Sequence, residues 1–384
     1  MTGSNKKVLV LGSGNFGSCL ADHLGDIEHK VFIHCRSQAT IDSLNTHRRN
    51  PKYLTDHEFS ANLTAIGPEP PTTEFLQGCD VIVFAIPTQS MRSVLKPLKL
   101  ESIKNLPLLV FVNKGIEIGT NKLPLEVIEE TCGPEVARVS TFLSGPSFAK
   151  EIVKRQPTQV SVAALSEEHA TRTAELFHQP WFRCYILLLI TIIHCLPFRS
   201  VNPDPIGIEL AGALKNVYAI ASGVASGLGY ESNTRAGLVT RGLAEMTRIG
   251  VAYGADPLTF LSLAGVGDLF LTCSSTKSRN FTVGERLGKG EDLDHIIETL
   301  GSVAEGVDTA KSAYAMVKEK GIDAPILEHV YRCLWEGETA GEMAKKLMSL
   351  RMMSEMEGIH DTGSAAASPK GTPKGSASGL KLAP

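Results

Sequence analysis

An apolar run that leads straight into a glycine pattern constrains this fold more than any other feature of the chain. Residues 6–11 read KKVLVL, and residues 12–17 read GSGNFG. A buried strand followed by GxGxxG at the start of a helix is typical of dinucleotide-binding βαβ units. There Gly12 permits the tight turn, Gly14 lets the backbone approach a pyrophosphate, and Gly17 allows close packing of the helix on the strand. The alternative is a glycine turn that serves only the structure.

The N-terminal half of the chain alternates apolar runs with helical patterns. The runs that we predict as further strands are HKVFIHCRS (29–37), DVIVFAIP (80–87), PLLVFVNKG (107–115), VARVSTFLSG (136–145) and TQVSVAA (158–164). Strands that are apolar almost throughout are buried on both faces, which favours a largely parallel sheet. Beyond Pro205 the sequence is rich in small residues, has a helical period and contains no convincing strand. We therefore predict an α/β, Rossmann-type doubly wound domain followed by an all-α C-terminal domain.

The expected domain boundaries follow from these changes in composition. We predict a dinucleotide-binding domain over residues 5–200 and a helical substrate and catalytic domain over residues 201–353. An apolar block, residues 186–200, ends the first domain. The last stretch, residues 358–384, is rich in Ser, Gly, Pro and Lys, so we expect it to be disordered.

Composition excludes several classes of function. The 384 residues carry a net charge of −3, which provides no basic field for nucleic acid. None of the eight cysteines forms a CxxC pair, so we expect no metal site and a reducing compartment. The N-terminus lacks the pattern of a signal peptide, and we expect a cytoplasmic protein, with import into an organelle as the alternative. The one long apolar run, residues 186–195, is too short for a membrane span, which needs roughly 18–20 residues.

The end of the second expected strand bears on the choice of cofactor. An Asp or Glu at this point would bind the ribose 2′-hydroxyl of NAD. Residues 34–37 read HCRS instead, with no acid between Glu28 and Asp42. Arg36 has the charge to meet a 2′-phosphate, so we expect NADP to be accepted alongside NAD. The alternative is that Arg36 is only a solvated charge at the end of a strand.

Polar residues that follow expected strands are the first candidates for chemistry. Lys114 lies in VNKGIE at the end of one strand, and SGPSFA, residues 144–149, ends another. Ligands of open α/β sheets bind at these carboxyl ends. The Gly-Pro turn in the second segment offers backbone N–H groups and the Ser147 hydroxyl to an anion.

The helical half contributes a second group of candidates. Lys215 lies in the apolar helix ELAGALKNVYAIA, where its amine is costly to bury without a partner or a purpose. The alternative is that Lys215 extends its amine to solvent, as most such lysines do. Asp268 interrupts the apolar stretch AGVGDLFLTCSS, and KSRNFTVG offers Ser278, Arg279 and Asn280 as donors for a phosphate.

Taken together, these segments resemble the NAD(P)-dependent glycerol-3-phosphate dehydrogenases, and their bacterial-type branch in particular. The matching motifs are VLGSGNFGSCLA, VNKGIE, SGPSFAKEI, NPDPIGIELAGALKNVYAIASG, AGVGDLFLTCSSTKSRNFTVG and VAEGV. They occur in the order of the family and span roughly residues 6 to 345. The resemblance implies a fold like that of 6-phosphogluconate dehydrogenase, NAD or NADP as cofactor, a phosphorylated triose as substrate and a homodimer.

The resemblance also implies a reaction and roles for single residues. Dihydroxyacetone phosphate and sn-glycerol 3-phosphate would be interconverted, with Lys215 as proton donor in reduction and general base in oxidation. Asp268 would orient the Lys215 amine or the substrate hydroxyl, and Lys114 would meet substrate and cofactor. The residues implied to bind substrate are Lys114, Gly145, Ser147, Lys215, Asp268, Ser278, Arg279 and Asn280. Those implied to bind the cofactor are Gly12, Gly14, Asn15, Phe16, Gly17, Arg36, Tyr53, Lys114, Ala149, Arg279, Val303 and Glu305.

A lysine that acts as a base near neutral pH needs a lowered pKa. An ordinary lysine has a pKa of about 10.4, which is too high for an efficient base near pH 7. We expect burial and nearby positive charge, from Lys114 and from an oxidised nicotinamide, to lower the pKa of Lys215.

The sequence leaves two other functions open. One is a sensor or impaired paralogue that keeps the nucleotide-binding unit without turnover. The intact set of Lys114, Lys215, Asp268, Arg279 and Asn280 argues against it. The other is a dehydrogenase of the β-hydroxyacid kind, which shares the two-domain plan and a lysine base. Such enzymes lack the SRNFTVG loop in this form.

The apolar block at residues 186–200 is the part least like the family. Relatives run from a strand like WFRCY directly into VNPDPIGIEL, which would join Tyr185 to Val201. The fifteen extra residues preserve the reading frame. We interpret them as a retained intron or a lineage-specific insertion without catalytic role, and expect their deletion to retain or improve soluble activity.

Overall fold

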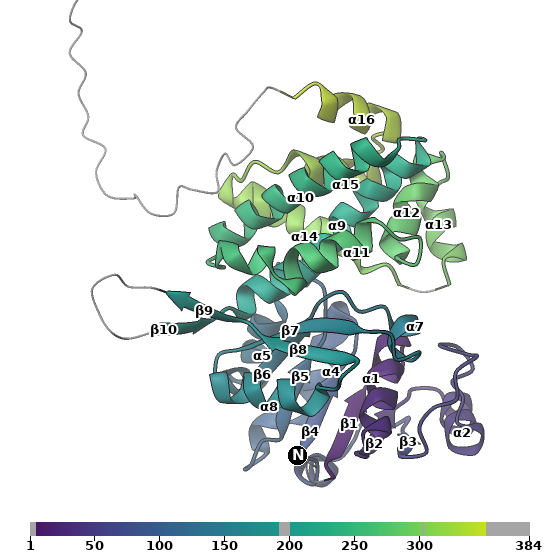
Figure 1. The fold of residues 1–384 in the computed structure, drawn as a ribbon, viewed down its shortest axis with the longest axis vertical. Helices are drawn as coiled ribbons and strands as arrows, with labels where there is room; N and C mark the ends of the chain where they lie inside the picture. Colours follow the sequence, from purple (N-terminus) through teal and green to yellow (C-terminus); the bar gives the residue numbers. More distant parts are fainter. Residues whose placement is uncertain (1–4, 192–199, 302, 351–384) are drawn as a thin grey trace, which may run out of the picture.

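The computed structural model describes residues 5–191, 200–301 and 303–350 as two packed domains. A sheet with helices on both faces forms the N-terminal domain, and a bundle of helices forms the C-terminal domain (Figure 1). The predicted fold class is thereby confirmed. The predicted disordered tail, residues 358–384, lies outside the described residues.

The N-terminal domain is built on one eight-stranded sheet in the order β3-β2-β1-β4-β5-β6-β7-β8. Its strands are β1 (Lys7–Leu11), β2 (Lys30–His34), β3 (Leu63–Ile66), β4 (Val81–Phe84), β5 (Leu108–Phe111), β6 (Ser140–Ser144), β7 (Thr158–Ala164) and β8 (Phe182–Ile186). Neighbouring strands are parallel except for β6 and β7, which run antiparallel. The largely parallel sheet predicted from the apolar strands is therefore confirmed.

Helices cover both faces of this sheet, as the strand sequences require. They are α1 (Asn15–Asp26), α2 (Gln38–His47), α3 (Thr73–Gln77), α4 (Met91–Leu98), α5 (Pro124–Cys132), α6 (Pro134–Val139), α7 (Ala149–Ile152) and α8 (Glu167–Phe177). Side chains alternate along a strand, so Val8 and Val10 of β1 enter the core on one face. Leu9 and Leu11 enter a separate core on the other face. Both faces of β1 are therefore shielded from solvent.

One predicted strand is partly wrong. Of residues 136–145, only the last part forms β6, because α6 extends to Val139. Pro134 is the first residue of α6, where its missing N–H costs no hydrogen bond and its fixed φ favours a helix. The Val136–Val139 segment packs on the sheet as one helical turn. The spacing of apolar residues over so short a segment does not distinguish a helix from a strand.

From Pro205 onward, the described residues of the C-terminal domain form helices and no strand. Its α-helices are α9 (Pro205–Gly227), α10 (Ser232–Ala252), α11 (Asp268–Cys273), α12 (Arg279–Gly288), α13 (Leu293–Thr299), α14 (Glu305–Lys320), α15 (Pro325–Trp335) and α16 (Ala340–Met348). Short helical turns at Pro257–Leu261 and Leu263–Gly267 lead into α11.

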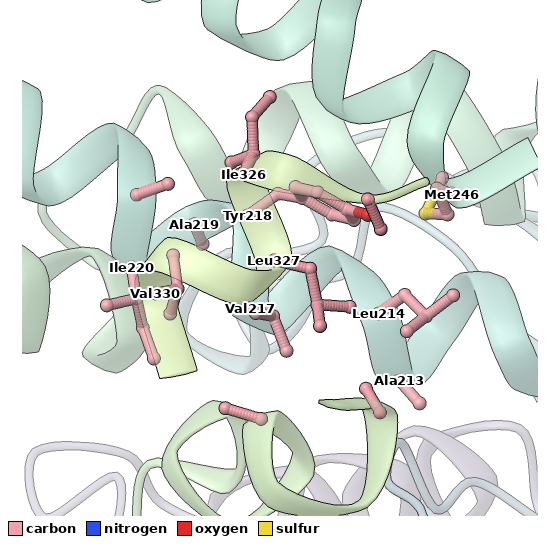
Figure 2. Close-up of a cluster of buried hydrophobic side chains, with 14 of the residues drawn as sticks. Ala213, Leu214, Val217, Tyr218, Ala219, Ile220, Met246, Ile326, Leu327 and Val330 are labelled. Carbon is pink, nitrogen blue, oxygen red and sulfur yellow. The ribbon is translucent and has the colours of Figure 1, made fainter. Parts of the chain in front are cut away.

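The central helix α9 is buried around nearly its whole circumference. Figure 2 shows Val217, Tyr218 and Ile220 of α9 against Leu327 and Val330 of α15. Such a helix needs small or apolar residues on every face, which explains why most of its residues are of these types. Its buried polar exceptions include Glu209, Lys215 and Asn216.

Helix α12 approaches α9 more closely than helices with larger side chains can. A Cβ on Gly284 of α12 would lie 1.9 Å from the carbonyl oxygen of Ile220, and one on Gly223 of α9 would lie 2.1 Å from that of Phe281. The two backbones therefore touch, which fixes the N-terminal end of α12 relative to α9.

The apolar block leaves the N-terminal domain as a hairpin. Ile186 still belongs to β8 and pairs with Val162, and the N–H of Leu187 donates to the carbonyl of Val162 at 2.8 Å. The excursion begins at β9 (Leu188–Thr191) and returns through β10 (Ser200–Pro203), with the two strands antiparallel. Figure 1 shows this hairpin projecting from the side of the molecule. Residues 192–199 lie outside the described residues. No helix of the described residues is long and apolar enough to cross a membrane.

The hairpin geometry defines more exact boundaries for a deletion that tests this block. Leu188 lies opposite Pro203, so removal of residues 188–202 joins Leu187 to Pro203 at the hairpin base. We expect the shortened chain to unfold within about 3 °C of the full chain in a thermal melt, because a lone hairpin stabilises little by itself.

Removal of residues 186–200 is the matched control, since it deletes the same number of residues. It substitutes Asn202 for Leu187, which packs against the core on one face of the sheet. The control should therefore have an unfolding free energy about 1–2 kcal/mol lower than the chain without residues 188–202. The sequence alone led us to expect that this deletion retains or improves soluble activity, without the cost of losing Leu187. A chain that does not fold without residues 188–202 would show that the hairpin is part of the core.

Candidate active site

A cavity of about 350 Å³ lies where the two domains meet. The N-terminal domain lines it with segments that follow β1, β4, β5 and β6, at the carboxyl ends of the parallel strands. The predicted site residues that line it are Gly14, Asn15, Phe16, Gly17, Tyr53, Lys114, Ser147, Ala149, Lys215, Ser278, Arg279, Asn280, Val303 and Glu305. Gly12, Arg36, Gly145 and Asp268 do not line it.

The glycine loop has the shape that a dinucleotide requires. Gly12 has a φ of +111°, and a Cβ there would lie 2.3 Å from the carbonyl oxygen of Ala85. A Cβ on Gly17 would lie 1.9 Å from the carbonyl oxygen of Gly12. A Cβ on Gly14, by contrast, would meet nothing within 4 Å, although Gly14 lines the cavity. The first two glycines are needed for the turn itself, and Gly14 leaves open space for a ligand.

Three charged side chains meet at the floor of the site. The Lys215 ammonium donates to Oδ1 of Asp268 at 2.7 Å, and the Lys114 ammonium donates to Oδ2 at 2.8 Å. Lys215 also donates to Oγ1 of Thr272 at 2.9 Å. Asp268 and Thr272 are four residues apart on α11, so both face α9. Lys215 and Asp268 are 6% and 1% exposed, so this is a buried charge cluster. Lys215 does not extend to solvent.

The surroundings of Lys215 lower its pKa to about 8. Burial is the largest cause, Lys114 acts in the same direction, and Asp268 opposes both. The predicted lowering by burial and by Lys114 is confirmed. Burial raises the pKa of Asp268, but the two lysines outweigh it, and the net shift is downward. The site thus holds a carboxylate beside an amine that can change its charge near neutral pH.

Gly145 reaches the site through its carbonyl oxygen. Lys114 donates to that oxygen at 3.2 Å, and the Ser147 hydroxyl donates to it at 2.8 Å. Asn216 donates to the backbone carbonyl of Lys114 at 3.2 Å. Lys114 is therefore held from both domains.

The N-terminus of α12 faces the cavity with Ser278, Arg279 and Asn280. The Ser278 hydroxyl caps the helix by accepting from the N–H of Phe281 at 3.3 Å. The Asn280 amide donates to Asn216 at 2.8 Å and accepts from the N–H of Gly306 at 2.9 Å. Asn280 thus ties α12 to α9 and α14. Free N–H groups at such an end favour an anion.

Three cofactor candidates have environments that sequence alone does not describe. Arg36 is exposed just beyond β2, outside the cavity. Glu305 lies at the start of α14, where burial raises its pKa and Arg279 opposes that effect. Val303, beside it, is 54% exposed although it lines the cavity.

Several lining residues were not predicted from the sequence. Thr272 was detectable, because it follows Asp268 by one helical turn. Asn216 was detectable as a second polar residue beside Lys215 in an apolar helix. Lys277 gives no such signal. It pairs with Glu151 across the domain boundary at 2.7 Å.

Two models of one protein family match this chain. The family model described as NAD-dependent glycerol-3-phosphate dehydrogenase N-terminus matches residues 7–170, and the corresponding C-terminus model matches residues 204–345. A glycerol-3-phosphate dehydrogenase [NAD(P)+] of Staphylococcus aureus is 41% identical over 91% of this chain and 99% of its own length.

Solved structures agree with this match. A glycerol-3-phosphate dehydrogenase from Coxiella burnetii superposes with a TM-score of 0.80 at 30% identity, covering 90% of this chain and 99% of its own. One from Plasmodium falciparum shares the fold with a TM-score of 0.75 at 20% identity, over 91% of this chain and 97% of its own.

Proposed function

This chain belongs to the NAD-dependent glycerol-3-phosphate dehydrogenase family, and we propose that it interconverts dihydroxyacetone phosphate and sn-glycerol 3-phosphate, with Lys215 as its acid and base. The observation that carries the assignment of roles is the buried Lys215–Asp268–Lys114 cluster beside an open glycine loop. The cluster brings a proton donor, its orienting carboxylate and a second cation to one end of the cavity.

The cofactor supplies or accepts the hydride when it is bound. The chain's task in reduction is to protonate the C2 oxygen of the substrate as negative charge develops there. Lys215 donates that proton and, in oxidation, takes it back. Asp268 holds the Lys215 amine by one oxygen and Thr272 holds it as well, so that the amine keeps one direction. Lys114 adds positive charge that stabilises the developing oxyanion.

The phosphate of the substrate suits the N-terminus of α12. Ser278 and Asn280 have their side chains engaged in capping and in the contact with Asn216, so the guanidinium of Arg279 and the backbone N–H groups are the main donors that we assign. Because α12 and α9 touch backbone to backbone, the distance between phosphate site and Lys215 is fixed.

Substitution of Arg279 tests the phosphate site. We expect Arg279→Leu to raise KM for dihydroxyacetone phosphate about 100-fold, because a charge-assisted bidentate contact is lost. Activity on unphosphorylated dihydroxyacetone should hardly change. Lys289→Leu, at the exposed far end of the same helix, is the matched control and should alter neither value. An equal loss with both substrates would remove Arg279 from the phosphate site.

The pH dependence tests the role of Lys215. A base must be deprotonated, so kcat/KM for oxidation of glycerol 3-phosphate should rise about tenfold per pH unit and level off near pH 8. An acid must be protonated, so kcat/KM for reduction should fall above about pH 8. If the pH profiles of oxidation and reduction share one midpoint, a single group transfers the proton in both directions. A flat profile between pH 6 and pH 9 would contradict the assignment.

A direct assay decides between this function and its rivals. Purified chain is mixed with dihydroxyacetone phosphate and NADH or NADPH, and the absorbance of the reduced cofactor is followed. Folded protein that binds the cofactor without oxidising it would indicate a sensor or impaired paralogue. Turnover of β-hydroxyacids in place of the phosphorylated triose would indicate the other dehydrogenase class.

Three further features are part of this proposal. NADP use rests on Arg36, whose exposed guanidinium is free to turn toward a 2′-phosphate. We also infer a homodimer and a cytoplasmic location. Sedimentation of the purified chain at twice its monomer mass supports the dimer, and a monomer at all concentrations rejects it.

A further inference from the structure

A buried asparagine outside the cavity wall connects two segments that line it. Asn50 is 0% exposed and lies in the turn after α2. Its Nδ2 donates to the carbonyl oxygen of Ser13 at 3.1 Å and to the Ser18 hydroxyl at 3.0 Å. Its Oδ1 accepts from the N–H groups of Lys52 at 3.0 Å and Tyr53 at 3.1 Å. An asparagine side chain has two N–H donors and two lone pairs, so every one of them is used.

The donors of Asn50 fix the direction of one peptide group in the glycine loop. The Ser13 carbonyl oxygen also accepts from the Ser18 hydroxyl at 3.1 Å, and so it is held by two side chains of the interior. In a planar trans peptide, the C=O and N–H groups point in opposite directions. The N–H of Gly14, in the same peptide, must therefore point away from Asn50. Gly14 lines the cavity, and we infer that its N–H faces that side.

The acceptor of Asn50 fixes a second segment of the cavity wall. Tyr53 lines the cavity, and its backbone N–H is bound by the same side chain that binds the Ser13 carbonyl. One amide group thus sets the distance between the glycine loop and the segment carrying Tyr53.

We propose that Asn50 is a positioning residue for the dinucleotide: with Ser18, it holds the Ser13–Gly14 peptide so that the Gly14 N–H faces the pyrophosphate, and it keeps Tyr53 in register with that peptide. The inference rests on the proposed function only in that the cavity takes a dinucleotide. It differs from a general stabilising role because it predicts a loss of binding confined to the pyrophosphate-containing ligand.

The test is a change that keeps the acceptor and removes the donors. Asn50→Asp still accepts from Lys52 and Tyr53, but it places a carboxylate oxygen against the Ser13 carbonyl. The dissociation constants of NADH, by its fluorescence, and of ADP-ribose, by calorimetry, should rise about tenfold or more. At saturating NADH, kcat for dihydroxyacetone phosphate should stay within about threefold, because the Lys215 cluster is untouched.

Asn45→Asp is the matched control in the same domain. Asn45 of α2 likewise donates to a backbone carbonyl and accepts from a backbone N–H, both of Ala65, at 3.0 Å and 2.8 Å. It should lower the unfolding temperature without changing the affinity for ADP-ribose. If Asn50→Asp does not fold, Ser18→Ala removes one of the two bonds to the Ser13 carbonyl and should weaken ADP-ribose binding about threefold.

The outcomes separate this inference from the proposed function. The role of Asn50 would be overturned if Asn50→Asp bound ADP-ribose as tightly as the unchanged chain does. Where Asn50→Asp does not fold, the same result with Ser18→Ala would overturn it. An equal loss of ADP-ribose affinity in Asn45→Asp would also overturn it. A chain that binds NADH and ADP-ribose with the expected pattern but does not turn over dihydroxyacetone phosphate would leave Asn50 in its role and reject the proposed reaction.

Discussion

Lys215→Met is expected to lower kcat for reduction of dihydroxyacetone phosphate by about 1000-fold or more. Methionine keeps the length of the side chain and its apolar stem, and it removes the proton donor and one of the two cations at the site. Asp268 keeps Lys114 as its partner, so the variant should fold. The dissociation constant of NADH should change by less than about threefold, because the glycine loop lies on the other domain.

Lys318→Met is the control for this experiment. Lys318 lies at the exposed end of α14, paired with Glu328, and should leave both kcat and NADH binding unchanged. The remaining rate of Lys215→Met should also lose its pH dependence near pH 8. A variant with more than about a tenth of the original kcat would show that another group moves the proton.

The sequence predicted the parts of the site that short motifs encode. GxGxxG after an apolar run predicted the glycine loop, because the turn, the close contact and the open space each require glycine. The sequence also singled out Lys215 as a charge in an apolar helix and Asp268 as a charge in an apolar stretch. Nothing local indicated that they pair, since they are 53 residues apart and meet only through the packing of α11 on α9.

Other parts of the fold and site could not be predicted from the sequence, because they depend on tertiary packing. The helical turn of α6 resembles a strand in composition, so only the packing decides it. Asn50 lies in an ordinary polar turn, and its four hydrogen bonds depend on α1 and the glycine loop being in place. The start of the apolar excursion at Leu188, two residues later than the expected Ile186, depends on the pairing of Ile186 with Val162.

Asp268→Asn is the change with the broadest expected effect, because this one carboxylate compensates two buried ammonium groups. An amide offers a single acceptor oxygen, and its NH2 group would face one of the lysines. Breaking such a buried pair costs about 3–5 kcal/mol of unfolding free energy. Asp268 raises the pKa of Lys215 against the effect of burial, so its removal should shift the oxidation profile below pH 8. Turnover in reduction at pH 7 should fall about 100-fold, since less Lys215 is protonated and its amine is no longer oriented.

Asp22→Asn is the control: Asp22 is also buried, binds His57 and the N–H of Ser60, and should lower stability without moving the pH midpoint. An unchanged midpoint in Asp268→Asn would mean that Asp268 stabilises the fold without setting the charge of Lys215.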